Sequence, residues 1–220
     1  MTYRNNLTKS VKMSRHPRQA ENPVPSDATA EDAKRSRILQ AAMKVFLAYG
    51  FSRVTMDDIA RASEMSRPAL YLVFRNKADI YQAIAASLVA ESLGKARAAL
   101  AAEGTFAGRM NAAIDSCMIS IFSEIAASPH GAEILDAKST LAADLLLSWK
   151  RDLGGIIRKA IEAEAKRNGV DLAAGELSAE MLAQFLLDGI EGMKSRLADP
   201  DQQRKAVRGL VKIVERTLQP

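Results

Sequence analysis

Apolar residues recur along this chain at intervals of three and four, the spacing that places side chains on one face of an α-helix. The first such stripe comprises Ile38, Ala41, Ala42, Val45 and Phe46. We expect its helix to run from Ala33 to Tyr49, because Gly50 can take the left-handed conformation that closes a helix. No segment shows the alternation typical of a strand, so the pattern predicts an all-α protein.

Two short helices are predicted between residues 55 and 74. Thr55 is an N-cap followed by acidic residues, which favour the start of a helix, and the apolar positions after it last only about two turns. Ser66 provides a second N-cap, and a proline is compatible with the first turn that follows. Leu70, Val73 and Phe74 would form the buried stripe of this second helix. The arrangement predicts a helix-turn-helix whose small first turn a DNA groove can approach.

Longer helices are predicted beyond Lys77, separated by caps and glycines. Asn76 caps a helix expected to reach about residue 100, and another apolar stripe covers residues 110–125. A short segment, 131–136, precedes a helix expected over about 141–168, which Gly169 would close. The last two helices are expected over 178–197 and, after the Asp199-Pro200 cap, over 200–218.

The first 32 residues differ in character from the rest of the chain. They are polar, contain three prolines and show no apolar periodicity, so we expect a disordered arm. The arm is basic over residues 1–20 and acidic over residues 21–32. Its basic part could follow DNA phosphates or enter a minor groove. The alternative is an ordinary disordered leader, because the acidic part would partly cancel the charge.

Composition narrows the class of protein. The 220 residues are 48% apolar but only 5% aromatic, and the abundance of alanine and leucine favours helix. A single cysteine, Cys117, excludes an internal disulfide, and two widely separated histidines argue against a zinc site. No apolar run is long enough for a membrane span or a signal peptide. The sequence therefore predicts a cytoplasmic protein that needs no cofactor.

The net charge of +5 is concentrated in the first third of the chain. Residues 33–77 hold nine basic residues against three acidic ones, whereas residues 78–220 carry a small excess of acids. Such asymmetry predicts a polyanionic partner for the N-terminal third. A solvated basic surface would produce the same pattern, so charge alone does not decide between the two.

The stretch ILQAAMKVFLAYGFSRVTMDDIARASEMSRPALYLVFRNKADIYQAIAA, residues 38–86, resembles the N-terminal domain of the TetR family of bacterial transcriptional regulators. The matching positions are Ile38-Leu39, Ala41-Ala42, Phe46, Gly50-Phe51, Thr55, Ile59-Ala60, Ser66, Leu70-Tyr71, Phe74 and Lys77. The resemblance implies a three-helix helix-turn-helix domain over 33–80 and a larger helical domain over 81–220 for ligand binding and dimerisation. Glu64 departs from the pattern, because the family's turn usually has glycine there; a left-handed backbone at Glu64 would cost roughly 1 kcal/mol.

The residues expected to contact DNA lie in and around the second short helix. They are Thr55, Ser66, Arg67, Pro68, Ala69, Tyr71, Leu72 and Lys77. Arg67 can present two donors to a guanine in the major groove, with a phosphate contact or a solvated charge as the alternative. Ala69 and Leu72 suit a thymine methyl group, although Leu72 could instead belong to the core.

Four of these residues are assigned to the DNA backbone rather than to bases. Tyr71 and Lys77 match family positions whose hydroxyl and ammonium contact phosphates. A lysine at a helix start is unfavourable for the helix dipole, which favours a functional reason for Lys77. Thr55 and Ser66 are first of all helix caps, and phosphate contacts come second.

The resemblance also implies a ligand pocket and a dimer interface in the C-terminal domain. The candidate pocket residues, each of which could instead be plain core, are Met118, Phe122, Leu145, Trp149 and Phe185. Few charges interrupt their stripes, so we expect an apolar or weakly polar effector. The candidate dimer contacts lie on the last two helices and are Gly189, Gly192, Val207, Leu210, Val211 and Val214. The alternative is that these two helices complete a monomeric core.

The function predicted from these features is ligand-responsive, sequence-specific regulation of transcription. In this prediction a homodimeric repressor leaves a pseudo-palindromic double-stranded operator when a small molecule fills the C-terminal domain. The alternative is a non-specific architectural DNA-binding protein, which would need a broader basic surface than residues 78–220 provide. An enzyme is not expected, because we find no phosphate loop, nucleophile elbow or metal-binding spacing.

Overall fold

The computed structural model describes the backbone of residues 27–220, with all side chains in this range except those of 27–29 and 137–140. All regular structure in this range is helical, which confirms the predicted all-α class. The α-helices are α1 (Asp27–Tyr49), α2 (Met56–Ala62), α3 (Arg67–Tyr71), α4 (Lys77–Ala101), α5 (Phe106–Ile114), α6 (Ser120–Ala126), α7 (Gly131–Leu141), α8 (Ala143–Asn168), α9 (Ala179–Lys194) and α10 (Pro200–Thr217).

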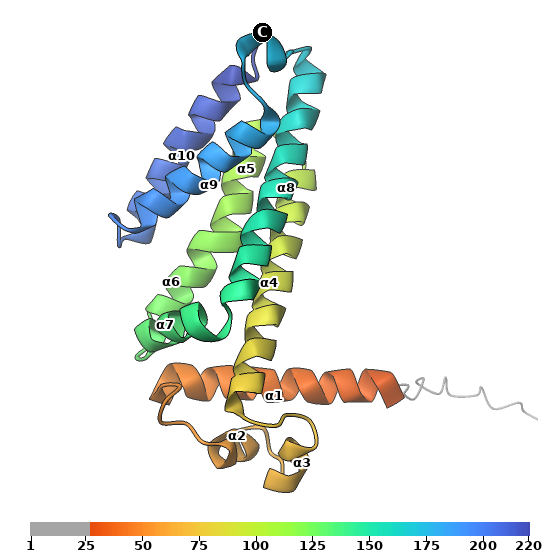
Figure 1. Ribbon diagram of the computed structural model, residues 1–220, viewed down its shortest axis with the longest axis vertical. Helices are drawn as coiled ribbons and strands as arrows, with labels where there is room; N and C mark the ends of the chain where they lie inside the picture. Colours follow the sequence, from red (N-terminus) through yellow and green to blue (C-terminus); the bar gives the residue numbers. More distant parts are fainter. Residues whose placement is uncertain (1–26) are drawn as a thin grey trace, which may run out of the picture.

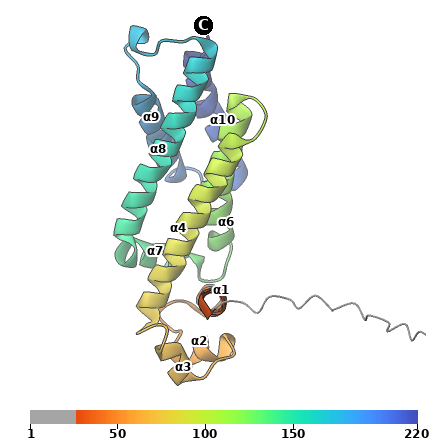
Figure 2. The ribbon, with the colours of Figure 1, turned by 90° about the vertical axis from the view of Figure 1, so that its right-hand side faces the viewer.

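The helices form a small lower unit and a tall bundle that share α4 (Figure 1). Helix α1 crosses below the bundle, and α2 and α3 lie beneath α1. Helix α4 rises from this lower unit and packs against α5 and α8, while α9 and α10 pack on each other along one side of the bundle (Figures 1 and 2). The short α2–α3 unit is therefore the lower tip of the molecule, and the C-terminus lies at the opposite end.

The first helix begins earlier than the sequence pattern predicts. Helix α1 starts at Asp27 rather than Ala33, so the predicted disordered arm is too long by the residues 27–32. Acidic residues are favourable in a first helical turn, where they face the positive end of the helix dipole, and residues 27–32 contain three of them. The rest of the predicted arm, residues 1–26, lies outside the described residues. The predicted end is confirmed, since Gly50 has φ +88° directly after Tyr49.

The predicted caps of the later helices are confirmed. The side chains of Asn76, Ser178 and Asp199 each accept a hydrogen bond from a backbone N–H in the first turn of α4, α9 and α10. Gly169 has φ +67° and closes α8, and the N–H of Val170 donates to the carbonyl of Ala165. These bonds satisfy backbone groups that a helix end leaves without intrahelical partners.

The middle of the chain is more helical and less regular than predicted. Residues 131–136 belong to a full helix, α7, rather than to a short connecting segment. The stripe over residues 110–125 is not one α-helix, because a π-helical turn, Asp115–Ile119, separates α5 from α6. A π-turn inserts an extra residue into the helix and shifts the face that follows, which a periodic count of apolar residues does not reveal.

The buried side chains form two clusters. The lower cluster joins α1–α3 and the start of α4, with fully buried Phe46, Ile59 and Leu70, but it also takes in Ile125 and Ile134 from the bundle. The upper cluster joins the rest of α4 to α5, α8, α9 and α10. Because side chains from α6 and α7 complete the lower cluster, the two units share packing rather than only a connecting helix.

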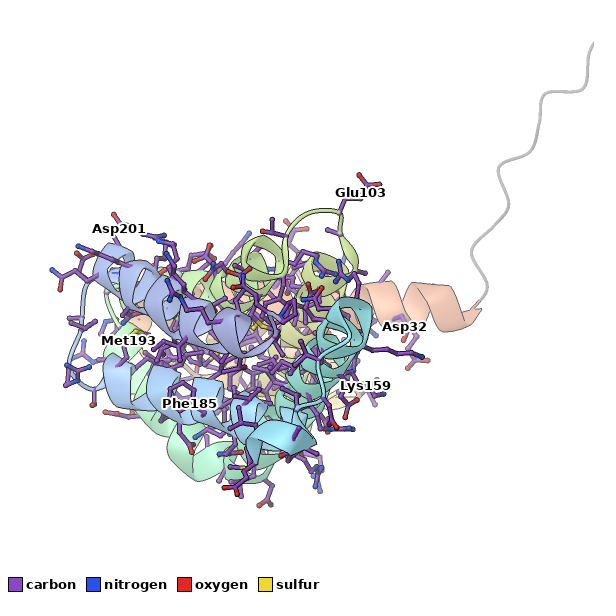
Figure 3. All side chains as sticks on the ribbon, turned by 90° about the horizontal axis from the view of Figure 1, so that it is seen from above. Asp32, Glu103, Lys159, Phe185, Met193 and Asp201 are labelled. Atoms are coloured by element: carbon purple, nitrogen blue, oxygen red, sulfur yellow. The ribbon has the colours of Figure 1, made fainter. Side chains whose placement is uncertain are left out.

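The apolar face of α10 packs within the chain. Val207, Val211 and Val214 are buried in the upper cluster, so they are not available to a partner subunit and their predicted place in a dimer interface is wrong. The close approach expected at Gly189 is real but is made within the chain, because a Cβ there would lie 2.9 Å from Leu210 Cδ1. From above (Figure 3), α9 and α10 run side by side with their side chains crowded between the helices.

The outer faces of α9 and α10 carry the remaining exposed apolar side chains of these helices. Met181 and Phe185 on α9 and Ile213 on α10 are exposed. At Gly192 and Gly209 nothing lies within 4 Å of an added Cβ, so the backbone there is open to an approaching surface. Across the described residues, no helix is both long enough and apolar enough to cross a membrane.

Candidate nucleic-acid interface

A reciprocal cap fixes the start of α2. The backbone N–H of Asp58 donates to the Thr55 hydroxyl oxygen over 3.3 Å, and the N–H of Thr55 donates to the Asp58 carboxylate over 2.9 Å. The Thr55 hydroxyl also donates to the Asp58 carboxylate over 2.6 Å, and this bond, together with that from the Thr55 N–H, lowers the pKa of Asp58. The cap function predicted for Thr55 is thus confirmed, and its side chain remains exposed at the lower tip.

In the turn between α2 and α3, a glutamate occupies the position where the TetR-family pattern usually has glycine. Glu64 adopts φ +57°, the left-handed conformation that glycine would take without strain. The N–H of Met65 donates to the carbonyl of Ala60 over 2.9 Å, and the buried Ser63 hydroxyl donates to the carbonyl of Ile59 over 2.7 Å. Hydrogen bonds on both sides therefore hold the turn in its usual shape despite the glutamate.

Helix α3 is anchored by one side and exposed on the other. Leu70 is fully buried and Phe74 nearly so, while Val73 is half-buried because α3 ends at Tyr71 and the next residues form a turn. Leu72 is 86% exposed, which excludes the alternative that it belongs to the core. The Ser66 hydroxyl oxygen accepts a hydrogen bond from the N–H of Ala69, which confirms its role as an N-cap.

The outward side of α3 presents most of the predicted DNA contacts together. Ser66, Arg67, Pro68, Tyr71 and Leu72 are exposed, and Ala69 is half-buried. The first turn carries only proline and alanine after Arg67, so little side-chain bulk stands between the backbone and an approaching surface. The candidate base-reading residues therefore lie together in and just after α3, which forms part of the lower tip of the molecule (Figure 1).

The guanidinium of Arg67 is held at the edge of this face. Its Nε lies 3.3 Å from the Asp57 carboxylate on α2, and its centre lies 5.6 Å from the centroid of the Tyr71 ring. Both members of the ion pair are more than half exposed, so the pair contributes little to stability. A partner with stronger acceptors could therefore draw the arginine away from Asp57 at small cost.

Lys77 has a structural role that the sequence did not indicate. Its ammonium donates to the carbonyls of Phe51, Ser52 and Val54 over 2.7, 3.0 and 3.1 Å, and it lies 4.8 Å from the centroid of the Phe51 ring. Three acceptors offset the unfavourable dipole of the helix start, so this position needs no phosphate to explain it. The predicted phosphate contact of Lys77 stays a prediction.

Three hydrogen bonds between residues far apart in the sequence join α7 and the residue before it to the lower unit and to α4. The N–H of Ser52 donates to the Glu133 carboxylate over 2.7 Å, and the N–H of His130 donates to the carbonyl of Leu47 over 3.2 Å. Hydrogen bonds from Ser52 are the main reason that the pKa of Glu133 is lowered. The Tyr81 hydroxyl donates to the carbonyl of Ile134 over 2.7 Å, and burial raises its pKa to about 12, so it remains a donor.

An apolar cavity of about 80 Å³ lies where α4, α6, α7 and α8 meet, directly above these contacts. Of the predicted pocket residues, Phe122, Leu145 and Trp149 line it. The Trp149 indole N–H donates to the Ser92 hydroxyl over 2.9 Å, and that hydroxyl donates to the carbonyl of Cys117. Burial raises the pKa of Cys117 to about 12, so its thiol remains protonated.

Two predicted pocket residues lie elsewhere. Met118 lines a separate, more open groove between α6 and the α9–α10 corner, and Phe122 forms a wall of both spaces. Phe185 is 44% exposed on the outer face of α9 and lines neither space, so its assignment to the pocket is wrong. Its helix has apolar residues on more than one face, and a stripe count does not show which face is buried.

The profile of the bacterial regulatory proteins of the tetR family matches residues 38–84, which cover α2, α3 and the adjoining parts of α1 and α4. Residues 38–84 are thus identified as the N-terminal domain typical of the TetR family. It is similar to the HTH-type transcriptional regulator SrpR of Pseudomonas putida, at 45% identity over 60 residues. That match covers 27% of this chain and 28% of SrpR, and the first four curated relatives are each matched over less than half of their length.

The fold of this chain as a whole resembles solved structures at low sequence identity. The fatty acid degradation regulator FadR from Bacillus halodurans superimposes with a TM-score of 0.59 and 19% identity, over 81% of this chain and 94% of FadR. SmeT, the repressor of the Stenotrophomonas maltophilia multidrug efflux pump SmeDEF, gives a TM-score of 0.55 and 17% identity, over 82% of this chain and 87% of SmeT. The likeness shows that the chain shares its overall fold, helical bundle included, with these structures.

Proposed function

We propose that this protein is a dimeric, sequence-specific DNA-binding repressor whose affinity for its operator falls when a small molecule occupies the helical bundle. The observation that carries the proposal is the outward side of α3, where Arg67, Tyr71 and Leu72 are exposed while Leu70 anchors the helix from behind. An exposed leucine and arginine on a rigidly anchored short helix suit contact with base edges in a major groove.

The backbone of the DNA would be held by groups around α3. The starts of α2 and α3 lie in this unit, and the N–H groups of a helix start favour phosphates. Arg53 and Arg61 are exposed in the same unit and add positive charge. The acidic excess of residues 78–220 would keep the remainder of the molecule away from phosphates, which favours a bounded site over architectural coating of DNA.

The response to an effector would pass through α4 and α7. Tyr81, Ile134 and Leu135 line the cavity, and the first two are joined by a buried hydrogen bond. A molecule larger than the present cavity must displace α7 or α4. Because Glu133 holds the N–H of Ser52 from α7, such a displacement would move the α1–α2 loop. In a dimer, this movement would change the separation of the two α3 helices and weaken simultaneous contact with both half-sites.

The dimer would form through the outer faces of α9 and α10. Met181, Phe185 and Ile213 are exposed there, and the open backbone at Gly192 and Gly209 would allow a second copy to approach closely. This assignment replaces the buried valines of α10 with side chains that a partner can reach.

Selection of bound duplexes from a random pool, followed by footprinting, tests the proposal. We expect an enriched pseudo-palindromic sequence, a bounded protected region, and an affinity that falls steeply with salt. Recovery of unrelated sequences with no bounded footprint would instead favour the architectural alternative.

A further inference from the structure

The groove beside the apolar cavity holds an ammonium group that the proposed function does not use. The groove has a volume of about 540 Å³ and lies between α6, α7 and the corner where α9 passes into α10. Among the residues with described side chains that line it, Lys194 alone is charged, and most of the others are apolar. An ammonium between apolar walls loses part of its hydration, which costs free energy unless an anion pairs with it.

Where side chains are described, the contact recorded for the Lys194 ammonium is with an aromatic ring rather than with a hydrogen-bond acceptor. Nζ lies 4.0 Å from the centroid of the Phe122 ring, a cation–π contact. Among residues whose side chains the structure describes, no carboxylate lies within ion-pair distance of it; the nearby Glu191 pairs with Lys150 instead, at 3.2 Å. Burial lowers the pKa of Lys194, and the nearby Glu191 carboxylate offsets only part of this effect.

Further polar groups of the groove are engaged within the chain. The Ser123 hydroxyl donates to the carbonyl of Ser120 over 2.9 Å, and the Gln203 amide donates to the carbonyl of Leu197 over 2.7 Å. Lys194 is therefore the group of this groove with the greatest capacity left for a ligand. The apolar walls provided by Met118, Ile119 and Ile190 suit a hydrocarbon body.

We infer that this groove binds a small amphiphilic carboxylate, with its carboxylate on the Lys194 ammonium and its apolar body against α6. One positive charge matches a single negative charge, whereas a phosphate dianion would bring a second negative charge into an apolar groove without a partner. The inference deepens the proposed function and rests on it, since it narrows the expected apolar or weakly polar effector to a monoanion.

The groove is placed to communicate with the cavity. Phe122 and Leu135 line both spaces, and the Phe122 ring meets the Trp149 ring edge to face with centroids 6.5 Å apart. An anion that draws the ammonium away from Phe122 would change the contacts of this ring, which forms part of the wall between groove and cavity. Leu135 belongs to α7, and Glu133 of the same helix accepts a hydrogen bond from Ser52 in the lower unit. A ligand that displaces Leu135 would therefore change the position of the DNA-binding face.

Trp149 is the chain's single tryptophan. It lines the cavity rather than the groove, and its contact with Phe122, which lines both spaces, makes its fluorescence sensitive to a ligand in the groove. We would titrate the full-length protein with octanoate, 1-octanol and octylamine below their micelle-forming concentrations and follow the tryptophan fluorescence. We expect saturable binding of octanoate that is tighter than that of 1-octanol by roughly tenfold or more, the ratio that one charge-assisted hydrogen bond provides. Octylamine should bind least well.

Two variants assign the preference to the ammonium. Lys194→Met should remove the preference for octanoate over 1-octanol, and Lys194→Arg should retain it, because arginine keeps the positive charge. Equal affinity of the unmodified protein for octanoate and 1-octanol would overturn the inference, as would an unchanged preference in Lys194→Met. The comparison of ligands on the unmodified protein does not depend on whether a variant folds.

A parallel DNA-binding assay separates this inference from the proposed function. Saturable, Lys194-dependent binding of octanoate supports the carboxylate site whether or not operator affinity changes. Operator affinity that stays constant at saturating octanoate would count against effector-controlled release, and not against the site.

Discussion

At the residue scale, Glu64 shows how local strain can be tolerated where the surroundings determine the backbone. Its φ of +57° belongs to the region that glycine occupies freely, yet the turn keeps its hydrogen bonds through Ser63 and Met65. The side chain itself is exposed, so the strain serves no packing contact.

Replacement of this glutamate by glycine should therefore stabilise the protein. For Glu64→Gly we expect a gain of about 0.5–1 kcal/mol, the relief of a left-handed residue less the extra entropy of an unfolded glycine. In thermal unfolding this corresponds to a rise of roughly 1–4 °C for a chain of this size. Glu103→Gly is the matched control, because Glu103 is exposed but does not have positive φ. If both variants melt at or below the temperature of the unmodified protein, the turn is not strained at Glu64.

For Lys77, the helix-dipole argument drawn from the sequence was incomplete. Its position at a helix start appeared unfavourable without a function, but three carbonyls of the α1–α2 loop satisfy its ammonium. Those acceptors lie more than twenty residues away in the chain, so helix-dipole reasoning could not find them. A loss of DNA affinity in a Lys77 variant would therefore need to be separated from a loss of loop structure.

At the scale of elements, caps and apolar stripes predicted most helices because both signals are local. Thr55, Asn76, Ser178 and Asp199 cap the helices that the sequence assigned to them. The errors came from features with no local signal. Helix α7 has little apolar periodicity, and the π-turn between α5 and α6 alters the phase of an otherwise regular stripe.

The candidate site was predictable to a similar extent. The exposure of the candidate DNA contacts follows from short-range patterning of α2 and α3, whereas the lining of the cavity depends on how five helices pack. Phe185 and the valines of α10 were misassigned because helices α9 and α10 carry apolar residues on both an inner and an outer face. Lys194 was missed because a lysine that follows an apolar stretch at a helix end is usually solvated.

The junction between α4 and α7 is the element contact most open to test. Tyr81→Phe removes one buried hydrogen bond, from the hydroxyl to the carbonyl of Ile134, with almost no change in shape. We expect a loss of about 1 kcal/mol in the free energy of unfolding, together with faster hydrogen exchange in residues 47–54. Tyr49→Phe is the control, since Tyr49 is 63% exposed. Equal stability and exchange in the two variants would show that this junction does not hold the lower unit.

At the scale of the whole molecule, the proposed dimer depends on the outer faces of α9 and α10. Phe185→Glu places a charge in the middle of this surface and, by symmetry, affects both copies. We expect the dimer dissociation constant to rise by at least roughly tenfold, as measured by analytical ultracentrifugation. Tyr49→Glu, which changes a more exposed aromatic residue in the lower unit, should leave the dissociation constant unchanged. A dimer that tolerates Phe185→Glu would place the interface elsewhere.

The architecture assigns a separate task to each end of the molecule. The lower tip offers an exposed reading face, the bundle offers a cavity and a groove, and α4 and α7 connect the two. The whole account depends on the exposed face of the lower tip, because a ligand in the bundle can regulate transcription only if that face recognises a DNA sequence.

The ratio of affinities for a selected operator duplex and a scrambled duplex tests that dependence most directly. The double variant Arg67→Ala/Leu72→Ala removes two exposed side chains from the outward side of α3, and Arg97→Ala/Leu147→Ala removes an exposed pair elsewhere. In fluorescence anisotropy at moderate salt, we predict that the α3 variant loses roughly tenfold or more of this ratio and that the control keeps it. An α3 variant that distinguishes the two duplexes as well as the unmodified protein does would contradict the account.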